Sequence, residues 1–527
     1  MLFNSLEFAF FLPIVFMLYW FLTPSGTNGP RYSLFHYWHV SEQTALRIQN
    51  AFVLVASYIF YGWWDWRFLL LIAFTSFCSW GSGLLINTSP SALSQGEGNR
   101  RRWFLPKFWM IANIILNLGI LAVFKYYDFF VSEFGQLFGI STESLLLKII
   151  LPVGISFYTF QALSYSIDVY RQKIEPTKDI IAFSAFIAFF SQLVAGPIER
   201  ATNLLPQFLQ KRTFSYDQAT DGMRQILWGL FKKIVVADNC ATYVDQVWAT
   251  YDTQTGSTLM LAAILFTFQI YGDFSGYSDI AIGTAKLFGI KLMRNFNNPY
   301  FSRDIAEFWR RWHISLTTWF RDYVYIPLGG SRPEIPAHIQ HPDRYKKWII
   351  VRNTFVIFLL SGFWHGANWT FMAWGAYHAI LFLSLILLGK NRKYTNQVAE
   401  GRFFPTWKEC GQILLTFLLV VFGWIIFRAP HMPTLLHYIE GICNASIFTI
   451  PWLMNRDFYI PLFLCIAVML LIEWFQRNKQ HGLDFLKCNK KSFHLFRMVL
   501  YVILTFLVEY YFCLSIEHPS AFIYFQF

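Results

Sequence analysis

Long apolar runs recur from one end of the chain to the other, separated by shorter polar stretches. The runs fall at 6–23, 49–63, 67–87, 108–128, 146–168, 180–197, 222–237, 258–288, 350–364, 370–389, 411–428, 458–475 and 496–515. A helix that crosses the hydrocarbon layer needs about 20 residues, so the shorter runs are expected to be tilted or re-entrant. We predict an all-α, polytopic integral membrane protein with about 11–13 transmembrane or re-entrant helices.

Polar stretches between these runs are predicted to be loops, at 88–106, 199–221, 330–347, 390–408 and 476–494. No internal repeat is visible, and nothing divides the chain into independent domains. We predict one membrane domain over 1–527, with N-terminal helices in 1–145, a core in 146–390 and C-terminal helices in 409–527. The first apolar run has no basic segment before it, and it is interpreted as a retained helix and not as a signal peptide.

The segment DIAEFWRRWHISLTTWFR, 304–321, does not follow the spanning pattern. On a helix its large apolar side chains fall within an arc of about 120°, and its charged side chains occupy the remainder. The apolar set is Ile305, Phe308, Trp309, Trp312, Leu316, Trp319 and Phe320, and the polar set is Glu307, Arg310, Arg311, Thr317 and Arg321. Asp304 with Glu307 resembles a capping box. We predict one amphipathic helix, in the headgroup layer or lining a wet funnel, with His313 at the edge of the apolar arc and Ile314 on the polar face.

Charge adds little to this picture. Only 14% of the 527 residues are charged, and the net charge is +12. The basic residues stand in small groups between apolar runs, for example Lys232 with Lys233, Lys346 with Lys347, and Lys390 with Arg392 and Lys393. Such groups orient membrane proteins beside anionic lipid, so no nucleic-acid partner is expected. The seven cysteines show no paired spacing, and neither a disulfide framework nor a zinc site is predicted.

His365 lies in sequence that is apolar enough for a membrane helix, within FWHGANWTFMAWGAYHA at 363–379. An ionisable side chain there faces a cavity or a partner, and small neighbours on both sides would admit a substrate or another backbone. A neutral imidazole can serve as a general base toward a hydroxyl; the alternative is a hydrogen bond to a neighbouring helix. On a continuous helix His378 would be ~20 Å away, so it is interpreted as structural.

Two further places put ionisable groups among apolar residues. In QIYGDFSGYSDIAIG, 269–283, Asp273 and Asp279 need partners such as Ser275, Tyr277 or an arginine, and Gly272 and Gly276 are able to interrupt the helix. A structural network and a catalytic one are both open there, and no metal site is predicted. On the amphipathic segment, Arg310 and Arg311 either anchor the surface or recognise a phosphate-bearing donor. No P-loop, GxSxG, HExxH or GxGxxG pattern is present.

Five blocks together resemble the signature of membrane-bound O-acyltransferases. They are LPVGISFYTFQALSYSIDVYR at 151–171, VAGPIER at 194–200, YGDFSGYSDIAIG at 271–283, FWRRWHISLTTWFRDYVYIPLGG at 308–330 and FWHGANWTFMAWGAYH from 363, with FIYFQF at the end of the chain. The resemblance covers nearly the whole chain. It is closer to the branch that contains the membrane subunit of alginate O-acetylation and the membrane protein of teichoic-acid D-alanylation.

The resemblance implies membrane helices around a central funnel that crosses a thinned region. It implies His365 as the essential active-site residue and His313 in a supporting role near the acyl-donor entrance. Donors such as Asn368 or Trp364 would stabilise the oxyanion. The candidate tunnel residues are Arg310, Arg311, Trp312, Trp364, Asn368, Asp273, Ser275, Tyr277 and Asp279.

The implied activity is transfer of an acetyl group from a cytoplasmic thioester, acetyl-CoA, across a bacterial inner membrane. The acceptor would be an extracytoplasmic polysaccharide such as alginate or peptidoglycan, and a separate periplasmic partner of the SGNH-hydrolase type would finish the transfer. No bound cofactor is expected. The runner-up is D-alanyl transfer from an acyl carrier protein. A flippase for a lipid-linked saccharide and a non-catalytic export scaffold are the alternatives from other classes; the flippase is disfavoured because no inverted repeat is visible.

Overall fold

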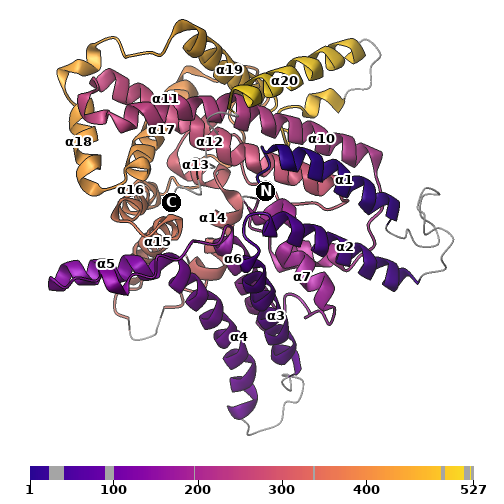
Figure 1. Ribbon diagram of the computed structural model, residues 1–527. Coiled ribbons are helices and arrows are strands. Elements are labelled where there is room, and N and C mark those ends of the chain that lie inside the picture. The colour runs from indigo at the N-terminus through magenta and orange to yellow at the C-terminus, as the bar shows by residue number, and fades with distance from the viewer. Residues whose placement is uncertain are drawn as a thin grey trace. The chain divides into compact units, whose positions relative to one another are not determined.

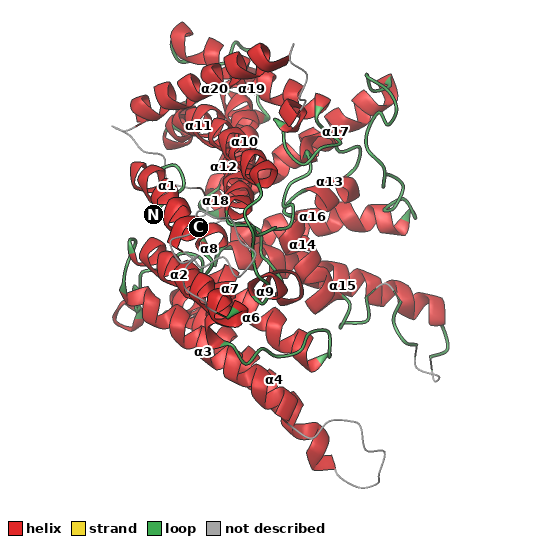
Figure 2. Cartoon of the chain, turned by 90° about the vertical axis from the view of Figure 1, so that its right-hand side faces the viewer, coloured by secondary structure: helices red, strands yellow, loops and turns green. Residues whose placement is uncertain are grey.

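The computed structural model describes residues 1–22, 41–88, 100–194, 196–330, 332–335, 339–487, 493–515 and 523, without the side chains of 100–104. These residues form helices and connecting loops and no strand, so the all-α prediction is confirmed for them (Figure 2). Within them, eight helical runs are long and apolar enough to cross a membrane: Arg67–Asn87, Leu105–Phe138, Gly256–Leu287, Pro342–His365, Trp369–Leu387, Trp407–Arg428, Arg456–Phe475 and His494–Ser515. Two shorter apolar helical stretches, Leu6–Phe21 and Ile180–Leu193, accompany them.

Parts of several predicted loops lie outside the described residues. These parts are 89–99, 331, 336–338 and 488–492, together with the C-terminal FIYFQF apart from Ile523. Within the described part, the predicted loop 199–221 contains a short helix and the start of a longer one.

The chain forms two compact units, of which the first comprises Met1–Met223 and Ala281–Met293 (Figure 1). Its helices are α1 (Leu6–Leu22), α2 (Glu42–Gly62), α3 (Arg67–Thr88), α4 (Arg100–Leu121), the π-helix η2 (Ala122–Tyr126), α5 (Tyr127–Phe138), η3 (Glu143–Leu145), α6 (Ile155–Tyr170), α7 (Ile180–Ala188), α8 (Phe190–Leu193) and α9 (Ala201–Phe208). It also holds the first half of α10 (Tyr216–Leu230) and the end of α12 (Gly256–Leu287).

Polar side chains join the helices of the first unit in its interior. Buried Arg212 donates to the hydroxyl of Tyr19 and to the amide oxygen of Asn50, both at 2.7 Å. The predicted span 146–168 becomes helical only at Ile155, after Gly154 at φ +75. A Cβ at Gly154 would lie 2.2 Å from a backbone oxygen of α8, so the turn requires glycine both for its conformation and for its packing.

The second unit comprises Arg224–Ile280 and Arg294–Phe527. Besides its parts of α10 and α12, it contains the π-helix η4 (Phe231–Ala237), α11 (Asp238–Ala249), η5 (Tyr251–Thr253), η6 (Pro299–Phe301), α13 (Ile305–Arg311), α14 (Ile314–Phe320), the π-helix η7 (Arg321–Tyr325), α15 (Pro342–His365), α16 (Trp369–Leu387), α17 (Trp407–Arg428), α18 (Met432–Ile442), η8 (Ala445–Phe448), α19 (Arg456–Phe475), η9 (Asp484–Lys487) and α20 (His494–Ser515).

Helices α15 and α16 form a tight antiparallel hairpin and lie side by side in both views (Figures 1 and 2). Two glycines permit this approach. A Cβ at Gly362 would lie 2.2 Å from the carbonyl oxygen of Phe371, and one at Gly375 would lie 2.4 Å from that of Phe358. The hairpin therefore depends on backbone contact that larger side chains would prevent.

The prediction of one helix over 304–321 is wrong, because the helix breaks between α13 and α14. Asp304 caps α13 by accepting from the Glu307 N–H, as expected. At the break the backbone pairs with segment 295–297: the Ile314 N–H donates to the Asn295 carbonyl, and the Asn297 N–H donates to the Arg311 carbonyl, both at 2.9 Å. These tertiary bonds replace the helical ones.

The break also changes which side chains face inward. Glu307 and Arg311, predicted to lie on the polar face, are buried and form an ion pair of 2.7 Å with each other. His313, predicted at the edge of the apolar arc, is fully buried. The hydrophobic periodicity of 304–321 therefore predicted helix here correctly but placed Glu307 and Arg311 on the wrong face.

Candidate active site

His365 is the last residue of α15, and its imidazole is 7% exposed. The chain leaves the helix at Gly366, which packs so closely that an added Cβ would lie 2.3 Å from the ring of Phe371. The ring of Phe427, from the end of α17, lies 5.2 Å from the imidazole of His365. The hairpin turn thus places this histidine in an aromatic enclosure.

Two tryptophans connect three buried imidazoles of the second unit. The Trp364 ring lies 6.0 Å from that of His313 and 4.9 Å from that of His365. The Trp374 ring lies 5.3 Å from that of His365 and 5.0 Å from that of His378. The predicted ~20 Å separation of His365 and His378 is wrong, because it assumed one continuous helix. The hairpin brings both histidines onto the same indole.

His313 occupies the break between α13 and α14, with φ +43 in the left-handed region. Its Nδ1 lies 3.1 Å from Oδ1 of Asn295, and the Phe274 ring packs edge-on against the imidazole at 4.6 Å. Burial lowers the pKa of His313 to about 3. The imidazole is therefore neutral at physiological pH, and its unprotonated nitrogen can accept a hydrogen bond.

Trp312 lies beside this histidine and is buried with its ring against two neighbouring helices. Its centroid is 4.9 Å from that of Trp424 on α17 and 5.6 Å from that of Phe308 on α13. Trp312 is thus part of the wall around the imidazoles, and it contributes area and shape to the site.

Of the two oxyanion candidates, Asn368 is engaged in the turn of the hairpin. Its carboxamide oxygen accepts from the Thr370 N–H at 3.0 Å and caps α16, and its amide donates to the Pro430 carbonyl at 2.6 Å. These bonds close the hairpin and tie it to the chain after α17. Trp364, the other candidate, lies directly against His313 and His365.

The two adjacent arginines of α13 have different environments. Arg310 is exposed and donates to the carbonyls of Asn391 and Tyr394, at 2.9 and 2.6 Å, in the loop between α16 and α17. Arg311 is buried and pairs with Glu307 at 2.7 Å. Arg310 therefore reaches the surface, whereas Arg311 belongs to the interior.

The carboxylates of α12 form ion pairs with lysines. Oδ1 of Asp273 lies 2.7 Å from the ammonium of Lys233, and its Oδ2 accepts from the Ile523 N–H at 2.7 Å. Asp279 pairs with Lys232 at 2.6 Å. Lysines are therefore the ion-pair partners of both aspartates, and Arg294 also interacts electrostatically with Asp279. The hydroxyl-bearing residues Ser275 and Tyr277 are fully buried on the same helix.

Lys232 and Lys233 were expected among the basic groups between apolar runs, and this too is wrong. Both side chains are buried, and both residues lie in the π-helix η4. A π-helical turn is frequent at functional sites. Here it directs two consecutive lysines toward aspartates on α12, which keeps the buried charges compensated.

Helix α12 is unbroken from Gly256 to Leu287, so its glycines, which were able to interrupt it, do not do so. These glycines serve close packing within the second unit. A Cβ at Gly272 would lie 2.8 Å from the Lys232 carbonyl oxygen, and one at Gly276 would lie 2.7 Å from that of Gly229. The contact brings the aspartates and the lysines of the two helices together.

Several residues of the site were missed by sequence reasoning. They are Asn295, Glu473 and the two lysines of η4. Glu473 accepts from the Tyr271 hydroxyl at 2.7 Å and lies 4.0 Å from the Lys232 ammonium. The lysines stood inside an apolar run, a signal that could have identified them. Asn295 lies in a polar loop, where nothing in the local pattern distinguishes it.

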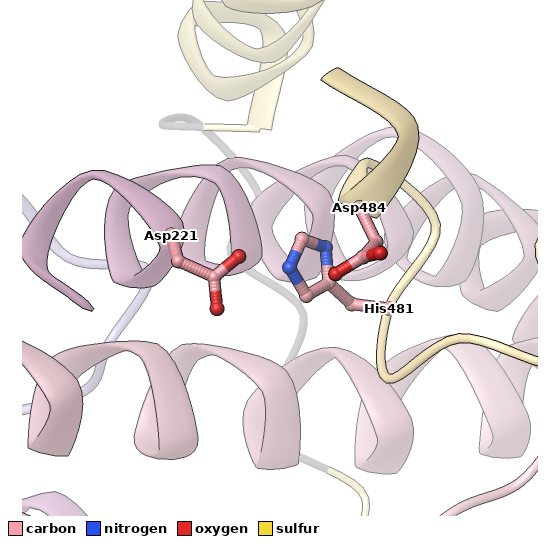
Figure 3. A group of neighbouring side chains, drawn as sticks. All are labelled: Asp221, His481 and Asp484. Atoms are coloured by element: carbon pink, nitrogen blue, oxygen red, sulfur yellow. The ribbon is translucent and has the colours of Figure 1, made fainter. Parts of the chain in front are cut away.

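Figure 3 shows His481 and Asp484, from the segment after α19, and Asp221 of α10. Asp484 pairs with Lys487 inside the second unit, and Asp221 pairs with Lys286 at 2.7 Å inside the first. Nδ1 of His481 accepts from the Leu483 N–H. Each carboxylate is thus compensated by a lysine of its own unit.

Comparison with known proteins identifies the family. Residues 172–395, which include both His313 and His365, match the membrane-bound O-acyltransferase family. The chain is 39% identical over 436 residues to the probable alginate O-acetylase AlgI of Pseudomonas aeruginosa, covering 82% of this chain and 73% of that protein. It is 31% identical to the peptidoglycan O-acetyltransferase of Helicobacter pylori, covering 91% and 90% of the two chains. The teichoic acid D-alanyltransferase of Bacillus subtilis is 28% identical and covers 52% of this chain and 68% of its own length.

These relatives cover most of the chain, and the eight apolar helices of the described part agree with a multi-pass membrane protein. This chain belongs to the membrane-bound O-acyltransferase family and is a multi-pass membrane O-acyltransferase.

Proposed function

We propose that this enzyme transfers an acetyl group from a cytoplasmic thioester, acetyl-CoA, toward an extracytoplasmic polysaccharide, with His365 and His313 as the reacting pair. The observation that carries the proposal is the enclosure of these two imidazoles against one indole, at the turn of a membrane hairpin. Similarity to alginate and peptidoglycan O-acetyltransferases over most of the chain supports acetyl as the group and a polysaccharide as the acceptor.

The charges at the ends of α15 and α16 support the direction of transfer. Exposed Lys346 and Lys347 lie near the start of α15, and exposed Lys390 and Arg392 follow α16. Basic groups of this kind mark the cytoplasmic side of a multi-pass protein. His365 ends the 24-residue helix α15, which at 1.5 Å per residue is about 36 Å long. The acceptor would therefore approach His365 from the extracytoplasmic side.

The helix α13 supports access from the cytoplasm. Arg310 is bonded to carbonyls of the basic loop after α16, and His313 follows three residues later, just past the end of α13. Three residues of chain span at most about 11 Å. A thioester held at the basic loop would therefore need only a short reach to the imidazoles, although CoA itself is too polar to cross the hydrocarbon layer.

The proposed chemistry is direct transesterification. A hydroxyl oxygen attacks the carbonyl carbon of the thioester, so that a C–O bond forms while the C–S bond breaks. The hydroxyl proton passes to the imidazole of His365 and then to the leaving thiolate, so no oxidant, reductant or water is consumed. The aromatic enclosure excludes water, which prevents hydrolysis of the thioester and strengthens electrostatic stabilisation of the transition state.

A separate extracytoplasmic partner of the hydrolase type would complete transfer onto the polysaccharide. The described segments between the helices of α15–α19 are loops and short helices, which support a channel-forming subunit more than a second catalytic domain. The attacking hydroxyl would belong to this partner, so that the acetyl group leaves the site near His365 as an ester of the partner and passes from there to a hydroxyl of the polysaccharide.

The test is the ester acetate released by mild alkali from the cell-surface glycan. Cells make the wild type, His365→Ala or the matched control His437→Ala, an exposed histidine on α18, at equal membrane abundance. We expect His365→Ala to lose most ester acetate and His437→Ala to retain it. Loss of D-alanine with unchanged acetate would instead establish D-alanyl transfer, the activity named for the Bacillus relative. Unchanged levels of both esters would contradict the proposal.

A further inference from the structure

We infer that Asn295 is a positioning residue that holds His313 in one tautomer, with the proton on Nδ1 and a free electron pair on Nε2. The inference rests on the proposed function, because it concerns an imidazole of the same site. Asn295 acts through His313, whose Nδ1 lies 3.1 Å from its Oδ1.

The hydrogen bonds of Asn295 decide which of its side-chain atoms faces the imidazole. Oδ1 accepts from the Ser315 N–H at 3.3 Å and from the Ser315 hydroxyl at 2.8 Å, and Nδ2 lies 3.1 Å from the hydroxyl oxygen of Ser278. A backbone N–H can only donate, so the atom beside it is the oxygen. The same oxygen lies 3.1 Å from Nδ1 of His313, which must therefore donate.

The backbone around His313 is fixed by the same asparagine. The Ile314 N–H donates to the Asn295 carbonyl at 2.9 Å, and Asn295 is fully buried. A histidine at φ +43 is in a sparsely populated conformation that persists only when its surroundings determine it. Asn295 therefore sets both the position of the ring and the location of its proton.

The consequence concerns Nε2, which is buried and has no hydrogen-bond partner among the described residues. The rings nearest to His313 are those of Phe274, Phe296 and Trp364, from α12, the following loop and α15, and none of them carries charge. The titratable group nearest along this aromatic path is His365, on the other side of Trp364. Nε2 can thus accept a hydrogen bond from a hydroxyl or a thiol. It cannot donate to the thioester carbonyl or attract a phosphate.

The pH dependence of acetyl transfer tests this assignment. Inverted membrane vesicles receive radiolabelled acetyl-CoA, an ionophore equalises the pH on both sides, and the acetyl ester in the vesicles is counted between pH 5 and pH 9. Because burial lowers the pKa of His313 to about 3, this group should give the wild type no acid limb between pH 5 and pH 9. Asn295→Asp keeps an oxygen beside Nδ1 and adds a charge that favours the imidazolium, so we expect an acid limb to enter this range in that variant. Asn295→Leu removes the acceptor, and we expect kcat to fall on the order of 10- to 100-fold with little change in KM.

Asn353→Ala is the matched control, because Asn353 is equally buried and its amide holds the carbonyls of Leu328 and Gly330. We expect it to lower the rate, if at all, equally at every pH. An Asn295→Asp profile with the same shape as that of the wild type would overturn the inference, whereas absence of acetyl transfer in wild-type vesicles would overturn the proposed function.

A second measurement needs no stable variant of Asn295. In ¹⁵N-histidine-labelled wild type, the nitrogen signals of His313 are identified by their loss in His313→Gln. A protonated Nδ1 and an unprotonated Nε2 support the inference, and the opposite tautomer contradicts it.

Discussion

Removing the cation of Lys233 is expected to destabilise the protein by several kcal/mol. Its ammonium lies 2.7 Å from Asp273 and 2.8 Å from Asp238, and all three side chains are buried. At an effective dielectric constant of about 20, each contact of this length is worth roughly 6 kcal/mol of Coulomb energy. This attraction offsets a desolvation cost of several kcal/mol for each ion. Lys233→Met leaves two buried carboxylates uncompensated, and we expect a loss of about 3–5 kcal/mol in the free energy of unfolding.

The free energy of unfolding would be measured in mixed micelles by titration with SDS, followed by tryptophan fluorescence. Lys347→Met is the control, because Lys347 is exposed near the start of α15 and should change stability by less than about 0.5 kcal/mol. The double variant Lys233→Met with Asp273→Asn removes one stranded carboxylate together with the cation. We expect it to be more stable than Lys233→Met alone, and the two-residue cycle gives the coupling energy.

Two results would refute this reasoning. If Lys233→Met and Lys347→Met unfold at the same SDS fraction, the buried ammonium does not stabilise the fold. If the double variant is no more stable than Lys233→Met, the loss comes from packing around the side chain and not from uncompensated charge.

Three further predictions follow from the site and its surroundings. His365→Gln should lower the rate of acyl transfer by about 10²- to 10⁴-fold at normal membrane abundance, measured as labelled ester, because it removes the general base. Gly362→Ala should lower the free energy of unfolding in SDS by about 1–3 kcal/mol, since the new Cβ would lie 2.2 Å from a backbone oxygen. The control Gly119→Ala should leave this free energy unchanged, because no heavy atom lies within 4 Å of its new Cβ. Burial raises the pKa of Glu199 from 4.5 to about 7. The stability that protonated Glu199 contributes is therefore complete below about pH 4.5 and is lost as the pH rises through 7. The melting temperature of the wild type relative to Glu199→Gln should therefore fall between pH 5 and pH 8, and a constant difference would contradict this assignment.

The helical architecture was predictable because its signal is local. A run of about 20 apolar residues must satisfy its own backbone in lipid, and a helix is the solution available to a single segment. His365 was identified for a related reason, since an imidazole in such a run is costly unless it has a use. The break at His313 was not predictable, because it depends on hydrogen bonds from segment 295–297, which the pattern of 304–321 does not contain.

The errors about polar residues have one physical origin. Lys232 and Lys233 were interpreted by their charge alone, as groups that remain at a membrane surface, but each has an aspartate of α12 within 2.7 Å. The pairing depends on the close approach of two helices at Gly272 and Gly276. The pattern of apolar and charged residues along the chain shows where a buried charge would be costly. It does not show the compensating charge, which comes from a segment elsewhere in the chain.

The polar groups of the second unit divide according to whether their protonation can change. An ionised side chain in a water-poor interior needs an opposite charge at short range, and the pairs of Lys232 with Asp279 and Lys233 with Asp273 have this arrangement. Such pairs hold helices together. A group that transfers protons must instead be stable in its neutral form, and burial alone maintains that form in His313. The paired charges therefore fit a structural role, and acid–base chemistry is left to the imidazoles among the aromatic rings.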